Sequence, residues 1–145
     1  MEGFVTLTIR KKDSEKLGKI AEILKLKKKS TAIMYLLNLL TVSLENAELY
    51  TNLNKIAKIS LEYAKRATTD STTTIMMKVK DKKKVEEFVE KYEICFFDAI
   101  SALVKFYDLL VEKYKDLTDE EKELVKTILF GGLEPTEEFV KQTQK

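Results

Sequence analysis

The sequence has no histidine and no tryptophan, and its 145 residues include one cysteine, one proline and four glycines. Without histidine, and with Cys95 alone, one chain cannot form a disulfide or the common zinc sites built from cysteine and histidine. The scarcity of glycine and proline favours long helices over a loop-rich or all-β fold. We therefore expect a mainly α-helical protein that needs no metal ion and no other cofactor.

The residue patterns that catalysis commonly uses are also missing. The chain has no glycine-rich phosphate loop, no nucleophile beside a base and no histidine to move protons. Cys95 lies in the apolar run of residues 94–97, where a small buried side chain is a commoner role than a nucleophile. The sequence predicts a protein that is not an enzyme and acts by binding.

Long apolar runs are absent as well. No run approaches the roughly 18 residues that a membrane span requires, and the N-terminus does not resemble a signal peptide, so we expect a cytoplasmic protein. A content of 44% hydrophobic and 34% charged residues is typical of a globular domain. The length predicts one helical domain over residues 1–132, followed by a charged C-terminal tail over residues 133–145.

The net charge of +2 is unevenly distributed. Residues 10–29 carry nine basic side chains against three acidic ones, whereas residues 112–145 carry nine acidic against six basic. A basic segment attracts polyanions, and an acidic segment attracts basic surfaces. The alternative for each segment is a solvated helical face of a lysine- and glutamate-rich protein.

Residues 5–40 contain the most informative pattern. Apolar residues alternate from Val5 to Ile9, which predicts a half-buried strand. Apolar residues then follow helical spacing after a cap candidate at Asp13 and Ser14, and again after a second cap candidate at Ser30 and Thr31. The predicted order is strand, helix, turn and helix.

This part of the chain resembles the ribbon-helix-helix repressors, in the strand sequence TLTIR, the helix sequence LGKIAEIL and the stretch KKKSTAI before the second helix. In that family two chains pair their strands into a ribbon that enters the major groove of DNA. The resemblance implies that Thr6, Thr8 and Arg10 face the bases. It also implies that Ser30 and Thr31 lie at a phosphate.

The chemistry of these residues supports the same expectation independently. Arginine binds guanine through two hydrogen bonds, threonine contacts a base or the thymine methyl group, and a helix start binds anions. The family usually has a small or glycine-containing turn between its helices, whereas this chain has the lysine-rich residues 25–29. The alternative is a strand or extended arm packed on a helical body.

Apolar residues continue at helical spacing from Thr31 to about Arg66, and they predict one central helix. Residues 68–74 predict a loop. A fainter copy of the opening pattern follows, with a strand at residues 75–79 and helical spacing up to Tyr114. The two copies, residues 5–66 and 75–115, are offset by about 67 to 70 residues.

The fainter copy leaves two interpretations open. If the repeat is real, residues 5–9 pair with residues 75–79, and Thr74, Met76 and Lys78 face DNA on the second strand. If it is accidental, residues 82–114 form one long helix of a bundle with about four helices, which is the interpretation we prefer from the sequence. In either case, Thr118 and Glu121 predict a capping box, and Gly131 and Gly132 predict the end of that helix.

The whole chain also resembles small lysine- and glutamate-rich proteins of archaeal viruses, in length, helical content and charged C-terminal end. These include helical-bundle proteins of two-tailed viruses that inhibit RNA polymerase. This resemblance implies a transcription repressor that binds host RNA polymerase in its DNA channel and blocks DNA or an initiation factor. The alternatives are a ribbon-helix-helix DNA-binding repressor and a DNA-associated helical-bundle virion protein.

The expected partner is therefore RNA polymerase or duplex DNA, without a small-molecule substrate or a membrane, and the protein is expected to be a monomer or dimer in the cytoplasm, of the host if it is viral. Besides the strand and cap residues, the candidate binding residues are lysines, namely Lys11, Lys12, Lys27, Lys28, Lys29, Lys78 and Lys80. In the C-terminal tail, Glu137, Glu138 and Phe139 are the predicted contacts with polymerase.

Overall fold

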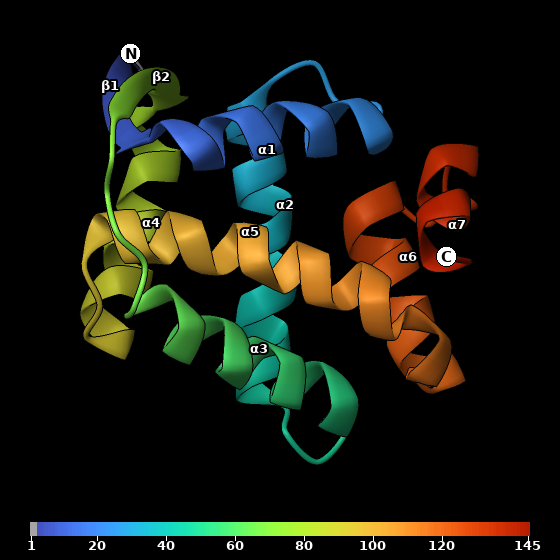
Figure 1. The fold of residues 1–145 in the computed structure, drawn as a ribbon. Helices are drawn as coiled ribbons and strands as arrows, with labels where there is room; N and C mark the ends of the chain where they lie inside the picture. Colours follow the sequence, from blue (N-terminus) through green and yellow to red (C-terminus); the bar gives the residue numbers. More distant parts are fainter. Residues whose placement is uncertain (1–2) are drawn as a thin grey trace.

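The computed structural model describes residues 3–145 (Figure 1). It is 69% helical, about twice the one-third typical of globular proteins. Residues 3–145 form seven α-helices, a short 3₁₀-helix and a two-stranded antiparallel sheet. The predicted mainly α-helical fold with a short N-terminal strand is confirmed, with more helices than the four or so expected. Among the described residues, no helix is long and apolar enough to cross a membrane.

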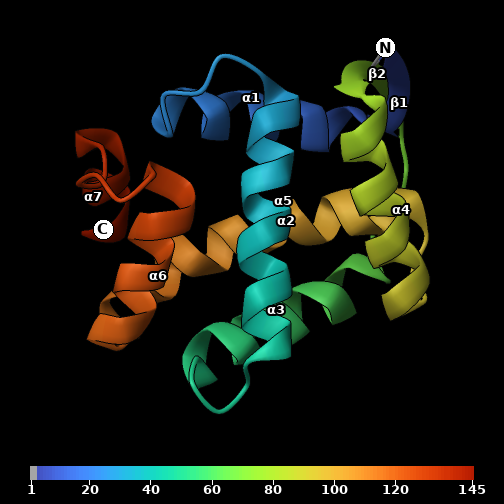
Figure 2. The same ribbon diagram turned by 180° about the vertical axis from the view of Figure 1, so that it is seen from behind.

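The chain opens with β1 (Phe4–Arg10), α1 (Lys11–Ile23) and α2 (Lys29–Glu45). In β1 the side chains of Leu7 and Ile9 are buried, while those of Phe4, Thr6 and Thr8 are exposed. This alternation is the one that the sequence predicted for a half-buried strand. The helix α2 is buried along most of its length, since it lies at the centre of the molecule (Figures 1 and 2).

A second strand-helix-helix unit follows, consisting of β2 (Thr72–Lys78), α4 (Val79–Tyr92) and α5 (Phe96–Lys113). The offset in sequence from the start of β1 to the start of β2 is the same as the offset from the start of α1 to the start of α4. The first helix of each unit is followed by a left-handed residue, Lys25 with φ 58° and Glu93 with φ 52°, and these two residues are separated by the same offset again. The chain therefore contains two structurally equivalent units.

The two units meet through their strands, which pair antiparallel to form a ribbon with Leu7 opposite Ile75 at its centre. Because Leu7 and Ile75 are also equivalent positions of the two units, an approximate two-fold axis passes through this pair. The backbone obeys the same symmetry at both ends of the ribbon. Each helix that follows a strand begins with an amide that donates to the residue preceding the opposite strand: Lys11 N to Ser71 O at 2.9 Å, and Val79 N to Gly3 O at 3.1 Å.

The predicted strand and loop boundaries in the second unit were wrong. The second strand covers Thr72–Lys78, and not residues 75–79 after a loop at 68–74. Threonine is β-branched and suits a strand, and Thr72, Thr73 and Thr74 lie opposite the last three residues of β1. Local periodicity could not predict that these threonines form a strand, because the strand with which they pair lies at the start of the chain.

The predicted helix caps at Asp13–Ser14 and at Ser30–Thr31 were also wrong. The caps are Arg10 for α1 and Lys28 for α2, and neither forms a side-chain capping hydrogen bond. For α1, the first amide is satisfied by a backbone carbonyl across the ribbon, so a capping side chain is not required.

The single helix predicted from Thr31 to Arg66 is two helices, α2 and α3 (Thr51–Ala64). At the break, the side-chain amide of Asn46 donates to Val42 O at 2.9 Å. The buried side chain of Asn54 returns from α3 and donates to Ser43 O at 3.0 Å. These two amides bind carbonyls that the end of α2 leaves without helical partners.

The long helix preferred for residues 82–114 is likewise two helices, because the chain turns at Glu93, which has φ 52° and ψ 47°. Cys95 then begins α5 as its N-cap residue and is exposed. The prediction that Cys95 is a buried apolar residue is therefore wrong. The short connection between α4 and α5 places Cys95 at the surface, whereas the prediction assumed that Cys95 lies within one continuous helix.

The last part of the chain forms α6 (Asp119–Phe130) and α7 (Glu137–Thr143), at the end of the molecule away from the ribbon (Figure 1). The capping box of Thr118 and Glu121 is present, and α6 ends at Gly131 with φ 60°. The predicted surface tail is wrong for α7, since Phe139 is fully buried. Its ring lies 5.0 to 6.2 Å from three other aromatic rings, those of Phe130, Tyr107 and Tyr114.

Candidate nucleic-acid interface

The ribbon has one buried face and one exposed face. Residues directly opposite each other in an antiparallel pair lie on the same face. The exposed face carries the opposed pairs Thr6 and Met76, Thr8 and Thr74, and Phe4 and Lys78. The predicted base-facing residues Thr6 and Thr8 therefore do lie on an exposed surface, together with the residues predicted for the second strand.

A groove of about 730 Å³ runs beside this face, between the ribbon and the start of α2. Three lysines from the turn before α2, one from the first residue of α2 and one from the ribbon line it, against a single aspartate. The lining residues are Phe4, Lys25, Leu26, Lys27, Lys28, Lys29, Ser30, Thr31, Ile75, Met76, Lys78 and Asp81. We call it the basic groove.

Contacts with other elements hold two lysines of the basic groove in place. The Lys28 ammonium lies 5.6 Å from the centre of the Phe4 ring, so a cation–π contact joins the turn to the ribbon. Lys29 Nζ donates to Ser14 Oγ at 2.8 Å, and this contact joins α2 to α1. The start of α2 adds the partial positive charge of its free amides, so an anion in the groove meets positive charge from two sides.

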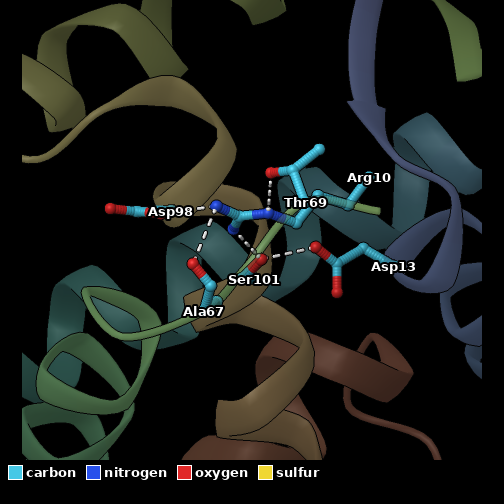
Figure 3. A network of polar contacts seen from close by, with 6 residues as sticks. All are labelled: Arg10, Asp13, Ala67, Thr69, Asp98 and Ser101. Atoms are coloured by element: carbon cyan, nitrogen blue, oxygen red, sulfur yellow. Dashed lines mark hydrogen bonds and ion pairs between the residues drawn. The ribbon is translucent and has the colours of Figure 1, made fainter. Parts of the chain in front are cut away.

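At the opposite end of the ribbon, Arg10 is not available to DNA, and the prediction that it reads bases is wrong. The residue is 8% exposed, and its side chain points into the protein (Figure 3). It donates to Thr69 Oγ1 at 2.8 Å, Ser101 Oγ at 2.6 Å, Asp98 Oδ1 at 3.0 Å and Ala67 O at 3.4 Å. Its guanidinium also lies 5.5 Å from the centre of the Phe97 ring.

The Arg10 network continues to Asp13, whose carboxylate accepts a hydrogen bond from Ser101 Oγ. Burial raises the pKa of Asp13, although the Ser101 hydrogen bond and the nearby charge of Arg10 act in the other direction. These contacts join α1, α5 and the segment before β2, so Arg10 has a structural role. Arginine is suited to this role because its guanidinium has five N–H donors in a fixed plane.

Arg10 and Lys78 occupy equivalent positions, since each is the last residue of its strand. Lys78 is exposed and lines the basic groove, whereas Arg10 fills the equivalent space at the other end with its own side chain. Ala67 and Thr69, from the connection between α3 and β2, accept hydrogen bonds from Arg10 and help to close this end of the ribbon. The approximate two-fold symmetry of the backbone is therefore broken by the side chains.

The charge follows the same asymmetry. The positions equivalent to Lys27, Lys28 and Lys29 are occupied by Cys95, Phe96 and Phe97, and the position equivalent to Lys25 by Glu93. The start of α5 thus has no lysine where the start of α2 has three. Of these two equivalent helix starts, only that of α2 brings lysines beside the ribbon.

The other predicted contacts are not among the residues that line the basic groove. Lys11 and Lys12 are exposed at the start of α1, near the closed end of the ribbon, and Lys80 is exposed at the start of α4. Glu137 and Glu138 are exposed on α7, at the far end of the molecule, where Phe139 is buried and cannot reach a partner.

Phe4 and Lys25 line the basic groove but were not among the predicted binding residues. Phe4 was left out of the predicted strand, although it has the same parity as Thr6 and Thr8, and this alternation could have revealed it. Lys25 was interpreted as part of the basic segment and of the turn between the first two helices. Its left-handed conformation turns the chain so that the lysines after it reach the ribbon.

Within residues 3–145, the acidic and cysteine side chains do not gather into a group that could hold a metal ion. Comparison of the chain with known protein families, with characterised proteins and with solved structures finds no match.

Proposed function

We propose that this protein is a non-enzymatic DNA-binding regulator that places its ribbon in the major groove of duplex DNA and holds a phosphate backbone in the basic groove. The observation that carries the proposal is the continuity of the two surfaces. Phe4, Met76 and Lys78 belong both to the exposed ribbon face and to the lining of the basic groove. A duplex that receives the ribbon therefore brings its backbone against the lysines before α2.

The dimensions of B-form DNA support this proposal. Its major groove is about 12 Å wide and admits a two-stranded ribbon. Each strand has 7 residues, which span roughly 23 Å, enough to contact several base pairs. The major groove of A-form RNA is deep and narrow, so duplex RNA offers no equivalent site.

Binding to RNA polymerase stays a prediction, and the structure removes one feature on which it depended. That hypothesis used an extended acidic tail, whereas Phe139 is buried and Thr136 Oγ1 donates to Ile23 O at 2.7 Å. The virion-protein alternative requires large apolar patches for self-assembly. The exposed large apolar side chains are instead spread over several elements of the described chain.

Duplex binding can be measured by fluorescence anisotropy over a series of salt concentrations, with duplex RNA of the same sequence as the control. For phosphate contacts, the logarithm of the association constant should fall against the logarithm of salt with a slope of about −0.9 per phosphate neutralised. Affinity for DNA that exceeds affinity for RNA would support the ribbon. Failure to bind any duplex at low salt would refute the proposal.

A matched pair of variants tests the basic groove. Lys27→Gln removes one positive charge, and it should weaken binding to every DNA duplex and reduce the magnitude of the salt slope by about one. Cys95→Glu changes the net charge by the same amount at the equivalent exposed position beside α5, and it should leave both quantities almost unchanged. Circular dichroism checks that both variants fold. Equal losses from the two variants would show that the DNA backbone contacts both sides of the ribbon.

A further inference from the structure

The centre of the exposed ribbon face is chemically unusual for a surface that reads DNA. Its four side chains are Thr6 opposite Met76 and Thr8 opposite Thr74. Within these two opposed pairs there is no arginine, asparagine, glutamine or carboxylate. The apolar character extends to the end of the ribbon, since Met76 is 59% exposed and Phe4 is 53% exposed.

Each base presents different groups in the major groove. Guanine is commonly bound by arginine or lysine, adenine by asparagine or glutamine, and cytosine by a carboxylate. Thymine presents a C5-methyl group, which apolar atoms, including the threonine methyl, contact directly. Three threonine methyl groups and one methionine side chain are therefore best suited to thymine, and Lys78, at the end of the ribbon, is suited to guanine.

We propose that the ribbon recognises thymine methyl groups, so that the protein prefers T-rich stretches of duplex DNA. This inference rests on the proposed function and adds the class of sequence that the ribbon selects. The burial of Arg10 supports this proposal, because it removes from the exposed face the only arginine of the two strands. Specificity then depends on shape and methyl contacts more than on hydrogen bonds.

The test removes the methyl groups from the DNA. Two duplexes of about 20 base pairs, or two helical turns, carry the same mixed A·T sequence, one with thymine and the other with uracil in its place. Burial of one methyl-sized group corresponds to roughly a fourfold change in affinity. Anisotropy should therefore show binding to the uracil duplex weakened by at least about fourfold, and by more if several methyl groups are contacted.

Two variants of Thr8 assign the effect to the ribbon. Thr8→Val keeps the methyl group and loses the hydroxyl, whereas Thr8→Ser keeps the hydroxyl and loses the methyl. We expect Thr8→Val to bind the thymine duplex as tightly as the wild type, and Thr8→Ser to bind it about fourfold more weakly. On the uracil duplex the wild type and Thr8→Ser should bind equally, because the methyl contact is already absent.

The outcomes separate this inference from the proposed function. If the wild type binds the thymine and uracil duplexes equally, or if Thr8→Ser binds normally while Thr8→Val does not, the methyl inference is overturned and DNA binding stands. If neither duplex binds at low salt, both fail. A wild-type preference for thymine that Thr8→Ser reduces and Thr8→Val preserves supports both.

Discussion

Arg10 shows how the environment of a single side chain decides its role. By strand alternation it belongs with Thr6 and Thr8 on the exposed face, yet its guanidinium turns inward and binds Asp98 and Ser101. The ion pair with Asp98 is largely buried, with side-chain exposures of 10% and 17%. Removing one partner of such a pair leaves the other desolvated and without compensation.

We therefore expect Arg10→Met to destabilise the fold by about 3 kcal/mol. Methionine keeps much of the apolar length of the side chain but cannot form the hydrogen bonds. Urea denaturation measures the effect, and Arg66→Met, at an exposed arginine, is the control, with an expected change within about 0.5 kcal/mol. Unchanged stability of Arg10→Met together with weaker DNA binding would instead favour the base-reading role that the sequence predicted.

Glu121 is a second buried side chain that joins distant segments. Its carboxylate accepts hydrogen bonds from Thr118 N at 2.9 Å at the start of its own helix, and from Asn52 Nδ2 at 2.9 Å and Leu53 N at 2.7 Å at the start of α3. Burial acts to raise the pKa of Glu121, but these hydrogen bonds to the charged form outweigh it and lower the pKa below the ordinary 4.5. One carboxylate therefore satisfies amides at the starts of two helices.

The lowered pKa predicts how stability depends on pH. The contribution of Glu121 is present above its ordinary pKa of 4.5, and it is lost as the pH falls through the lower pKa of the folded state. Glu121→Gln should cost about 2 kcal/mol at neutral pH, and this difference from the wild type should shrink in acid. Glu120→Gln, at an exposed neighbour, is the control. A loss that is the same at every pH would point to packing and not to charge.

At the scale of elements, the junctions between helices determine the fold. In each unit, a residue with positive φ ends the first helix and directs the chain into the second. These residues are Lys25 and Glu93, which are not glycines and therefore adopt a left-handed conformation at an energetic cost. The turn at Glu93 separates α4 from α5 where periodicity predicted one continuous helix.

The left-handed conformation of Glu93 can be tested by the sign of the stability change that glycine causes there. Glycine adopts positive φ readily, so Glu93→Gly should stabilise the protein by up to about 1 kcal/mol. Glu90→Gly, at an exposed position within α4, should destabilise it by about 1 kcal/mol. Thermal denaturation of the two variants measures both effects. Destabilisation by Glu93→Gly would contradict the left-handed turn and favour a continuous helix.

At the scale of the whole molecule, the two strand-helix-helix units share one core, which α3, α6 and α7 extend. Phe139 anchors the C-terminus in an aromatic cluster, and Tyr107 Oη donates to Gln142 Oε1 at 2.8 Å. The C-terminus is consequently part of the folded body. It lies at the end opposite the ribbon, and DNA on the ribbon would not contact it (Figure 2).

Removal of residues 134–145 should therefore destabilise the protein, because it exposes the aromatic cluster to water. Phe139→Ala alone should cost about 3 to 5 kcal/mol. Val140→Ala, at a neighbouring position that is 38% exposed, is the control and should have a small effect. Both are measured by urea denaturation. A truncated protein as stable as the full chain would restore the surface tail that the sequence suggested.

The sequence by itself determined those features that depend on near neighbours. Alternation over a few residues marked the first strand, the Thr118–Glu121 spacing marked a helix start, and Gly131 marked a helix end. Each depends on backbone geometry and on partners within about one helical turn, so a short window of sequence contains the whole cause. The offset between the two units was also visible, because equivalent elements repeat similar apolar spacing.

Only the tertiary structure decided which surface is free to bind. Arg10 and Lys78 end equivalent strands, but Asp98 and Ser101, in the first turns of α5, bind one of them, while the other lines the basic groove. The sequence assigned Phe139 to a surface tail, whereas the structure buries its ring among three other aromatic rings. In each case the deciding contact lies far away in the chain, and the residue type alone is compatible with exposure or burial, so the sequence could not distinguish the exposed residues from the buried ones.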